Sequence, residues 1–460
     1  MSVERKTLNS FQSLGLSKAI LRAVSAAGYD NPTPIQKAAI PALLKKRDIV
    51  GIAQTGTGKT AAFVLPLLDR ISNSFERPEP NTCDVLILAP TRELAAQIHE
   101  NVRLYGKYVE MTSTIIVGGV KPGKQVRALS RGISVLVATP GRLEDLQSSG
   151  AISLHATKAV VLDEADQMMD MGFIPAIRRI MKSLPKNRQT ILFSATMPKQ
   201  IRSLANDFLH RPEEIAVTPA SRPVDRIKQS VIAVAKSDKR QKLVEVLNGQ
   251  EFERAIVFSR TKHGANKIAR HLEQAGITAD AIHGNKSQNQ RERTLDGFKS
   301  GEISVLVATD IAARGIDIGG VSHVINFDLP NVPEAYVHRI GRTARAGASG
   351  VAISFCDAEE RDLLRDIEKL IGRAFDVEGN FEVVSTAAEP NQRSKGQRQH
   401  GNRNRSSGQA KRSVKPKGNG GNSRDERRKD GSQNHEGAQR TQSKRRRNRR
   451  RSSGGAKKAA

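Results

Sequence analysis

Short apolar runs alternate with longer amphipathic segments over residues 1–375. Apolar runs that show no alternation with polar residues are typical of parallel strands buried on both faces. The first series of candidate strands is Ile49–Ala53, Val85–Ala89, Ser113–Val117, Val135–Ala138, Ala159–Leu162 and Thr190–Phe193. The second series is Ala255–Phe258, Asp280–Ile282, Val305–Ala308, His323–Phe327 and Val351–Phe355. Strands that alternate with helices in this way predict an α/β fold with two parallel sheets.

A segment rich in Pro and short polar residues separates the two series and shows little helical periodicity, so we interpret it as a linker. The predicted organisation is an N-terminal segment (1–38), a first domain (39–211), a linker (212–224), a second domain (225–375) and a basic tail (376–460).

One heptapeptide relates the two domains. Ile133–Thr139 recurs identically as Ile303–Thr309, and each copy ends in Thr at a predicted strand exit. Convergence is an alternative, because buried parallel strands use few residue types. Seven identities favour duplication or a shared role.

Charge concentrates at the end of the chain. Residues 391–460 contain 23 Lys or Arg and four Asp or Glu, so they carry +19 of the net +28. They contain no aromatic residue, Leu, Ile or Met, and such segments cannot offset their ordering entropy. We expect a disordered tether for a polyanion such as nucleic acid, with a solubilising tail as the alternative.

Few features place the protein in a compartment. Cys83 and Cys356 lie far apart and form neither a metal-binding spacing nor a disulfide framework. The N-terminus lacks an apolar signal core, and no apolar run is long enough to span a bilayer. We therefore expect a cytoplasmic protein without a membrane partner.

The first strand leads into a candidate phosphate-binding loop. Gly56 and Gly58 let backbone N–H groups approach phosphate oxygens, Lys59 supplies a positive charge, and Thr60 can bind Mg²⁺. Ala53 stands where the usual pattern has Gly. The complete loop is Ala53, Gln54, Thr55, Gly56, Thr57, Gly58, Lys59 and Thr60.

Three carboxylates follow the buried run Ala159–Leu162. We interpret Asp163 as the Mg²⁺-associated carboxylate and Glu164 as the base that orients and deprotonates the attacking water. Capping of the next helix would explain one carboxylate but not three. The role of Asp166 is the least defined, and we assign this residue to interdomain or motif coupling rather than to the metal.

These residues resemble the signature of the DEAD-box RNA helicases, Asp163-Glu164-Ala165-Asp166, and further motifs follow in the family's order over residues 9–375. The resemblance implies tandem RecA-like domains, ATP and Mg²⁺ as cofactors, and RNA as the partner. The nucleotide residues that it implies outside the loop are Phe11, Tyr29, Thr33, Gln36, Gly315 and Asp317. The RNA contacts that it implies are Pro90, Thr91, Arg92, Gly118, Gly119, Thr139, Arg142, Arg260, Thr261, Gln288, Arg291, Thr309 and Asp310. The coupling residues that it implies are Asp166, Ser194, Thr196 and Arg339.

The resemblance assigns Arg342 and Arg345 of the second domain to the γ-phosphate, so they act only when the domains close. The opening motif, the stretch Arg260–Asn266 and the basic tail look most like the bacterial RhlE subgroup. One departure is Ala344, which stands where the family usually has Gly and would resist a positive φ.

The expected function is RNA-stimulated ATP hydrolysis coupled to local unwinding of RNA duplexes, in ribosome assembly or RNA decay. An ATP-gated RNA clamp would use the same closed state. Gly28-Tyr29 and Pro32–Gln36, with Phe11 upstream, resemble the family's adenine-reading Q motif. The resemblance ties this motif, together with Asp163–Asp166, to RNA, which opposes a DNA helicase. A non-catalytic RNA-binding scaffold would have no need of all four of Lys59, Glu164, Arg342 and Arg345.

Overall fold

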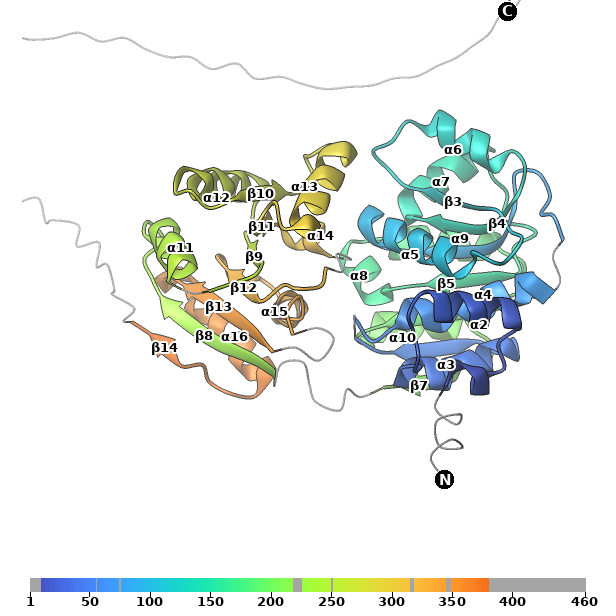
Figure 1. Ribbon diagram of the computed structural model, residues 1–460, viewed down its shortest axis with the longest axis horizontal. Coiled ribbons are helices and arrows are strands. Elements are labelled where there is room, and N and C mark those ends of the chain that lie inside the picture. Colours follow the sequence, from blue (N-terminus) through green and yellow to red (C-terminus); the bar gives the residue numbers. More distant parts are fainter. Residues whose placement is uncertain are drawn as a thin grey trace, which may run out of the picture. The chain divides into compact units, whose positions relative to one another are not determined.

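The computed structural model describes residues 10–54, 56–73, 76–217, 226–249, 251–314, 318–344 and 349–379. Within these ranges the chain forms two seven-stranded sheets covered by helices (Figure 1). Several predicted features lie outside the described residues: Thr55, Gly315, Asp317, Arg345 and the tail at 391–460.

The first sheet is parallel throughout, in the order β3-β4-β2-β5-β6-β1-β7. Its strands are β1 (Ile49–Ile52), β2 (Cys83–Leu88), β3 (Ser113–Ile116), β4 (Ile133–Ala138), β5 (Ala159–Leu162), β6 (Gln189–Ser194) and β7 (Glu213–Ala216). Its helices are η1 (Phe11–Leu14), α2 (Lys18–Ala26), α3 (Pro34–Leu44), α4 (Lys59–Asn73), α5 (Arg92–Tyr105), α6 (Pro122–Leu129), α7 (Pro140–Ser148), α8 (Ala165–Asp170), α9 (Ile174–Ser183) and α10 (Lys199–Phe208).

The second sheet is also parallel, in the order β10-β11-β9-β12-β13-β8-β14. Its strands are β8 (Ile227–Ala233), β9 (Ala255–Phe258), β10 (Ala279–Ile282), β11 (Val305–Ala308), β12 (His323–Asn326), β13 (Gly350–Cys356) and β14 (Val377–Glu378). Its helices are α11 (Lys239–Asn248), α12 (Lys262–Gln274), α13 (Gln288–Ser300), α14 (Asp310–Ala313), α15 (Pro333–Ile340), η4 (Ala358–Glu360) and α16 (Arg361–Ile371).

Burial on both faces explains why the central strands read as continuous apolar runs. In β2, Val85 and Ile87 join one hydrophobic cluster, whereas Leu86 and Leu88 join the cluster on the other face of the sheet. Successive strand residues point to opposite faces, so both alternating sets must be apolar. The predicted α/β class with two parallel sheets is confirmed.

The repeated heptapeptide occupies equivalent places in the two sheets. Its copies form β4 and β11, each the second strand from one edge. Thr139 and Thr309 are then the N-cap residues of α7 and α14. The same residues therefore build the same strand exit in both domains, which supports a shared role for the two threonines.

Three strands were missed by the apolar pattern. β7 and β14 lie at sheet edges, and β8 lies beside β14. Edge strands are partly exposed and need no continuous apolar run; β7, for example, begins with Glu213 and Glu214. Because β7 pairs with β1, residues 213–216 belong to the first sheet rather than to the predicted linker. Likewise, β14 pairs with β8 although it falls within the predicted tail.

Over the described part of the chain, the helices are too short or too polar to cross a membrane.

Candidate nucleotide and RNA site

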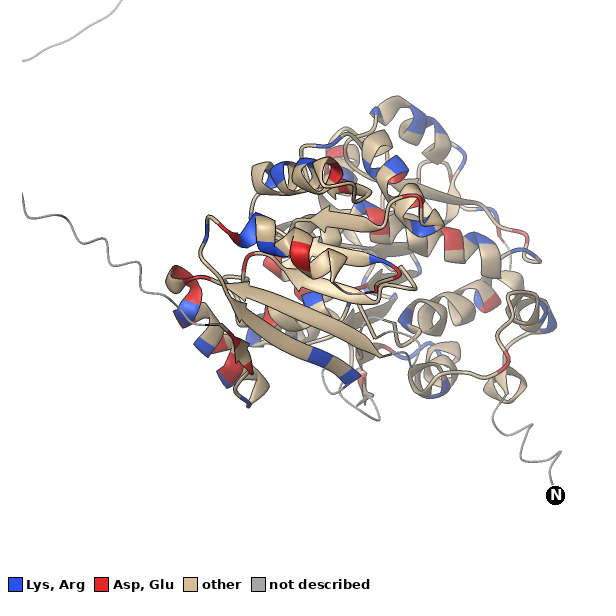
Figure 2. Cartoon of the chain, turned by 60° about the vertical axis from the view of Figure 1, so that its left-hand side comes forward, with Lys and Arg blue, Asp and Glu red and all other residues tan. Residues whose placement is uncertain are grey.

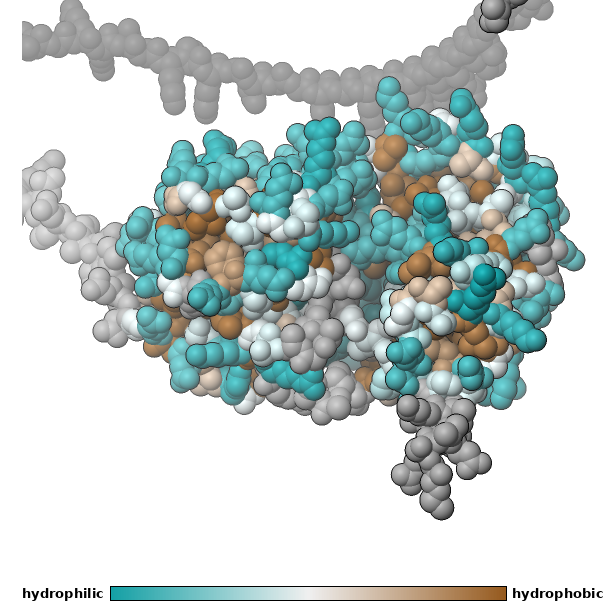
Figure 3. All heavy atoms as spheres, in the orientation of Figure 1, coloured by the Kyte–Doolittle hydropathy of each residue, from teal (hydrophilic) through white to brown (hydrophobic). Residues whose placement is uncertain are grey.

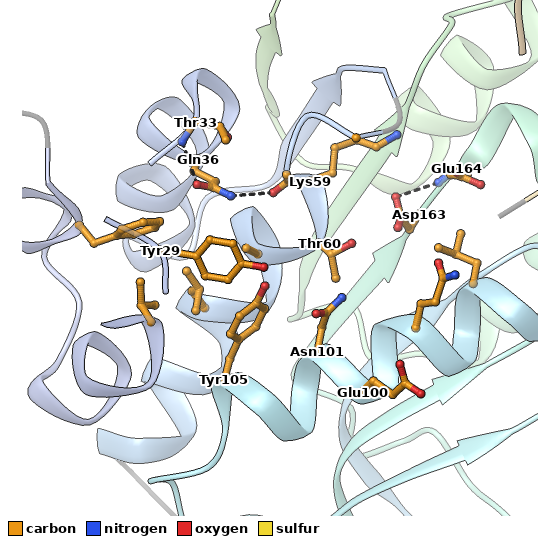
Figure 4. Close-up of a pocket in the computed structure, with 18 of the residues that line it drawn as sticks. Tyr29, Thr33, Gln36, Lys59, Thr60, Glu100, Asn101, Tyr105, Asp163 and Glu164 are labelled. Atoms are coloured by element: carbon orange, nitrogen blue, oxygen red, sulfur yellow. Dashed lines mark hydrogen bonds between the residues drawn. The ribbon is translucent and has the colours of Figure 1, made fainter. Parts of the chain in front are cut away.

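Three neighbouring strand ends of the first sheet surround the phosphate loop. β1, which precedes the loop, pairs with β6, and β6 pairs with β5, which ends at the acidic motif. Parallel strands present their carboxyl ends at one edge of a sheet, where α/β proteins bind ligands. A cavity of about 460 Å³ opens there and is lined by Lys59, Thr60, Asp163 and Glu164, among others (Figure 4).

Glycine is required in this loop for a specific contact. Gly58 has φ +90°, and a Cβ atom there would lie 2.5 Å from the Gln36 amide nitrogen. That nitrogen donates to the Gly58 carbonyl at 3.1 Å, while the Gln36 Oε1 accepts from the Thr33 N–H at 2.8 Å. A primary amide has two N–H groups and two lone pairs, so Gln36 keeps one of each for an adenine edge while it joins its own motif to the loop.

The cavity contains a buried lysine and a buried glutamate, each with a polar atom that lacks a hydrogen-bond partner among the described residues. Lys59 is the first residue of α4 and is 6% exposed, yet its Nζ has no hydrogen-bond partner among the described residues. In the same part of the chain, Glu164 Oε2 is also buried without a partner. A buried ammonium left without a hydrogen bond is costly unless a ligand completes it. These atoms therefore mark the place where an anionic group and a polar nucleophile bind.

Burial sets the protonation of the two carboxylates. The pKa of Glu164 is raised to about 7, chiefly by burial and also by the neighbouring Asp163 carboxylate, although Lys59 and Arg342 oppose the shift. Burial also raises the pKa of Asp163, again against Lys59. A general base works best when its pKa lies near the working pH. Glu164 meets that condition, and it sits at the N-cap of α8 with φ 54°.

Asp166 binds the coupling motif rather than the cavity. Its Oδ2 accepts from the Ala195 N–H at 3.1 Å, the Thr196 N–H at 2.9 Å and the Thr196 hydroxyl at 3.1 Å. The Ser194 hydroxyl in turn accepts from the Asp166 N–H at 3.2 Å. This arrangement supports the prediction that Asp166, Ser194 and Thr196 couple neighbouring strand ends.

The predicted RNA motifs of the first domain meet at the ends of β2, β3 and β4, which are adjacent in the sheet. A Cβ atom at Gly119 would lie 2.1 Å from an Arg92 guanidinium nitrogen, so Arg92 lies across this glycine, which has φ +77°. Arg142 donates to the Val120 carbonyl at 3.0 Å. Thr91 caps α5, and Pro90 precedes it.

In the second domain, several predicted RNA residues are engaged by protein groups. The Asp310 carboxylate accepts two hydrogen bonds from Arg339, one of them at 2.8 Å. Arg260 is paired with Glu360. Thr261 caps α12 and accepts from the Gly264 N–H at 3.0 Å. For Asp310 and Arg260, direct contact with RNA stays a prediction.

Contacts between the two sheets' helices join motifs that are far apart in sequence. The Arg291 Nε of α13 donates to Glu93 of α5 at 2.8 Å, and both side chains are buried. Beside them, Arg92 donates to Gln288 at 3.3 Å. Arg314 donates to Asp170 of α8 at 2.9 Å. Arg291 thus has its Nε committed to a carboxylate, although sequence reasoning assigned it to RNA.

Arg342 of the second domain lines the same cavity as Lys59 and Glu164. It is 4% exposed, and its Nε donates to the His338 carbonyl at 3.1 Å. Sequence reasoning found this residue but missed Glu93 and Glu360. A carboxylate within a motif that binds phosphates was the available signal for Glu93, because such a group needs a cationic partner.

Two like α/β domains, one with a phosphate loop and the other with an arginine in the same cavity, define a nucleotide-driven enzyme with tandem RecA-like domains. The DEAD/DEAH box helicase family model matches residues 33–204, and the helicase conserved C-terminal domain model matches residues 238–347. The chain belongs to the DEAD-box family and is an ATP-dependent RNA helicase.

Similar proteins include the DEAD-box ATP-dependent RNA helicase CshA of Bacillus subtilis (strain 168), which is 44% identical over 367 residues, 80% of this chain and 73% of that protein. CshA of Geobacillus kaustophilus (strain HTA426) is also 44% identical, over 80% of this chain and 77% of its own. Among solved structures, S. cerevisiae Dbp5 bound to RNA and ADP BeF3 has a TM-score of 0.71 and 36% identity, over 80% of this chain and 95% of that one. These relatives do not support the predicted RhlE subgroup.

Proposed function

We propose that this helicase hydrolyses ATP in the cavity between the phosphate loop and Arg342, and that bound RNA controls the reaction by favouring closure of the two domains. The observation that carries the proposal is the cavity itself: Lys59, Glu164 and Arg342 line one space, although Arg342 belongs to the second domain. Each ligand that favours closure then raises the affinity for the other.

Within the cavity, Lys59 holds the terminal phosphates and Glu164 accepts the proton of the attacking water. Arg342 stabilises charge on the transferred phosphoryl group. An arginine in this role contributes roughly 10³–10⁵ in rate, about 4–7 kcal/mol of barrier. Arg345 is assigned the same role by its motif. ATP hydrolysis is therefore slow whenever the second domain is separated from the first.

The residues present also fit Mg²⁺. No group of three or more Asp, Glu, His or Cys side chains that could hold a metal ion occurs in the described ranges. Mg²⁺ typically uses one or two carboxylates together with substrate phosphates, and Asp163 with the Thr60 hydroxyl offers that donor set beside the loop. When bound, the ion would neutralise phosphate charge.

RNA lies, in this proposal, along the strand exits that carry Thr139 and Thr309, held by backbone amides, hydroxyls and arginines. Such contacts read phosphates and sugars, so they carry little sequence selectivity. Arg291 acts through its hydrogen bond to Glu93, and Asp310 acts through its hydrogen bond from Arg339. We assign the protein to the cytoplasm. Its partners in this proposal are ribosomal particles or the machinery of RNA decay.

The Glu164→Gln variant tests the central assignment. It keeps the size of the side chain but removes the base, so RNA-stimulated turnover should fall about 10²- to 10⁴-fold while ATP-dependent RNA binding persists. Lys59→Ala is the matched control, since it should lose turnover and ATP-dependent RNA binding together. Normal turnover by Glu164→Gln would refute the base. Equal stimulation by RNA and by DNA of the same sequence would refute selectivity for RNA.

A further inference from the structure

One helix of the first domain has a cationic side that the proposed mechanism does not use. Between Glu110 and Glu144 the chain contains five Lys or Arg residues and no Asp or Glu. Four of these cations, at spacings of three, three and four residues on and beside α6, are Lys121, Lys124, Arg127 and Arg131. Within the helix, the spacing of Lys124 and Arg127 places both on one side. We call these two residues, together with Lys121 at the N-cap and Arg131 just after the C-cap, the α6 cationic face. Figure 2 shows blue bands on this helix, at the top of the cartoon.

The charges of this face are not neutralised by carboxylates in the described part of the chain. All four side chains are exposed, and none of them forms an ion pair with a described carboxylate. Helix α9 shows the opposite pattern: Arg178 pairs with Asp207 and Arg179 pairs with Glu144. An ordinary solvated surface mixes charges in the way α9 does. The α6 cationic face departs from that pattern, which points to an anionic partner.

The face is held firmly against the proposed RNA motifs. On the inner side of α6, Leu129 is fully buried, and Gln125 donates to the Val117 carbonyl at 3.0 Å. Gly118 and Gly119, which lie against Arg92, follow Val117 directly. Arg142 donates to the Val120 carbonyl at 3.0 Å, one residue before the first cation. A phosphate bound on α6 would therefore lie at a defined distance from a strand bound at the glycines.

We propose that the α6 cationic face binds the phosphate backbone of an RNA duplex that flanks the strand held at Gly118, Gly119 and Arg142. This inference rests on the proposed function, and on the RNA-binding role that the family resemblance implies for those three residues. It adds a second contact, which selects RNA with a duplex next to the bound strand. The enzyme would thereby hold the duplex that it is about to open.

Duplex RNA fits this face better than a single strand. Sites for single strands combine cations with aromatic side chains on which bases stack. The exposed large apolar residues at α6 are Val120 and Val126, and Tyr29, far away in sequence, is the one exposed aromatic side chain of the described residues. Figure 3 shows hydrophilic side chains projecting at the upper right, where Figure 1 places α6. A duplex keeps its bases inside and its phosphates outside, so cations alone suffice.

The test replaces the four cations together, Lys121, Lys124, Arg127 and Arg131, each by Gln, in the full-length chain. The matched control replaces four exposed cations elsewhere that also lack a described ion pair, Lys182, Lys186, Arg240 and Arg270, each by Gln. Both variants lose the same charge. Affinity is measured between 50 and 200 mM salt for a single strand and for the same strand with an adjoining duplex.

The α6 variant should lose affinity for the duplex-containing RNA, with a salt slope shallower by about 3–4, since each phosphate contact contributes about 0.9. Its deficit relative to wild type should therefore shrink about a hundredfold between 50 and 200 mM salt. Single-strand affinity and ATPase activity at saturating single strand should match those of the control, which also shows that the variant is folded.

Three results would overturn the inference: equal losses for single strand and duplex, a duplex affinity equal to that of the control variant, or α6-dependent binding to anionic lipid vesicles with duplex affinity intact. Failure of the proposed function looks different. In that case single-stranded RNA would not stimulate the ATPase activity of the wild-type protein. This result is independent of the α6 variant.

Discussion

Two non-glycine residues, one in the acidic motif and one just after Arg342, adopt left-handed backbone conformations: Glu164 at φ 54° and Ala344 at φ 55°. This conformation costs an L-residue about 1–2 kcal/mol, and it persists where the surroundings impose it, often at functional sites. Glu164 takes it in the step from β5 into α8, which presents its carboxylate to the cavity. Ala344 takes it two residues after Arg342, although alanine was expected to resist a positive φ at this position.

Replacement of Ala344 by Gly should relieve this strain. Because glycine loses more entropy on folding, the net gain in the free energy of unfolding should be at most about 1 kcal/mol, a rise of about 2–4 °C in the Tm of the second domain. Ala344→Val should lower the Tm, because a branched side chain fits this φ poorly. Calorimetry measures both. A lower Tm for the Gly variant would contradict the prediction.

At the scale of elements, Asp280 joins β10 to the helix that meets the first domain. Its carboxylate accepts hydrogen bonds from Lys286, in the loop before α13, and from Thr294, on α13. Burial alone would raise the pKa of Asp280, but these bonds outweigh it and hold the pKa below its ordinary value of 3.8. The ionised carboxylate therefore stabilises the position of α13.

The Asp280→Asn variant should loosen α13 by about 1 kcal/mol, after allowance for solvent screening of a partly exposed group. Because the pKa is lower in the folded state, the stabilisation is complete above 3.8 and is lost only as the pH falls through the folded pKa. The deficit should thus be constant from pH 8 to about pH 5. Hydrogen exchange of α13 amides measures it, with Asp296→Asn, an exposed carboxylate of the same helix, as control. A deficit that grows toward pH 8 would contradict this.

At the scale of the whole molecule, the buried pair of Glu93 and Arg291 connects the helices of the two sheets. Removal of one member of a buried pair leaves an unpaired charge and typically costs 3–5 kcal/mol. That cost falls on the closed arrangement alone, because both groups can be hydrated when the domains separate. The pair therefore contributes to the closure on which Arg342 depends.

Glu93→Gln and Arg291→Gln should each lower RNA-stimulated ATPase activity more than tenfold. The double variant should lose much less than the sum of the two effects, as expected for residues in contact. Steady-state kinetics with RNA measure this coupling. Arg293→Gln, an exposed cation of α13, should leave the activity unchanged. Additive losses would show that the two residues act independently.

Much of the architecture could be predicted because buried parallel strands leave a strong apolar signal. The central strands β5, β9 and β11 begin and end where the pattern predicted. The apolar pattern did not predict the edge strands β7 and β14, because a strand with one exposed side can contain polar residues. The phosphate loop and Asp163–Asp166 were likewise readable, because each follows such a strand directly.

The sequence by itself determined the fold class, the chemistry of the ATP site and the charge of the α6 cationic face, because each depends on residues close together along the chain. Only the tertiary structure decided which charges are already used. Arg291 is committed to Glu93, and Asp310 to Arg339, whereas Lys59 and the α6 cations have no described partner. Pairing depends on distances between segments far apart in sequence, and the order of residues along the chain does not contain those distances.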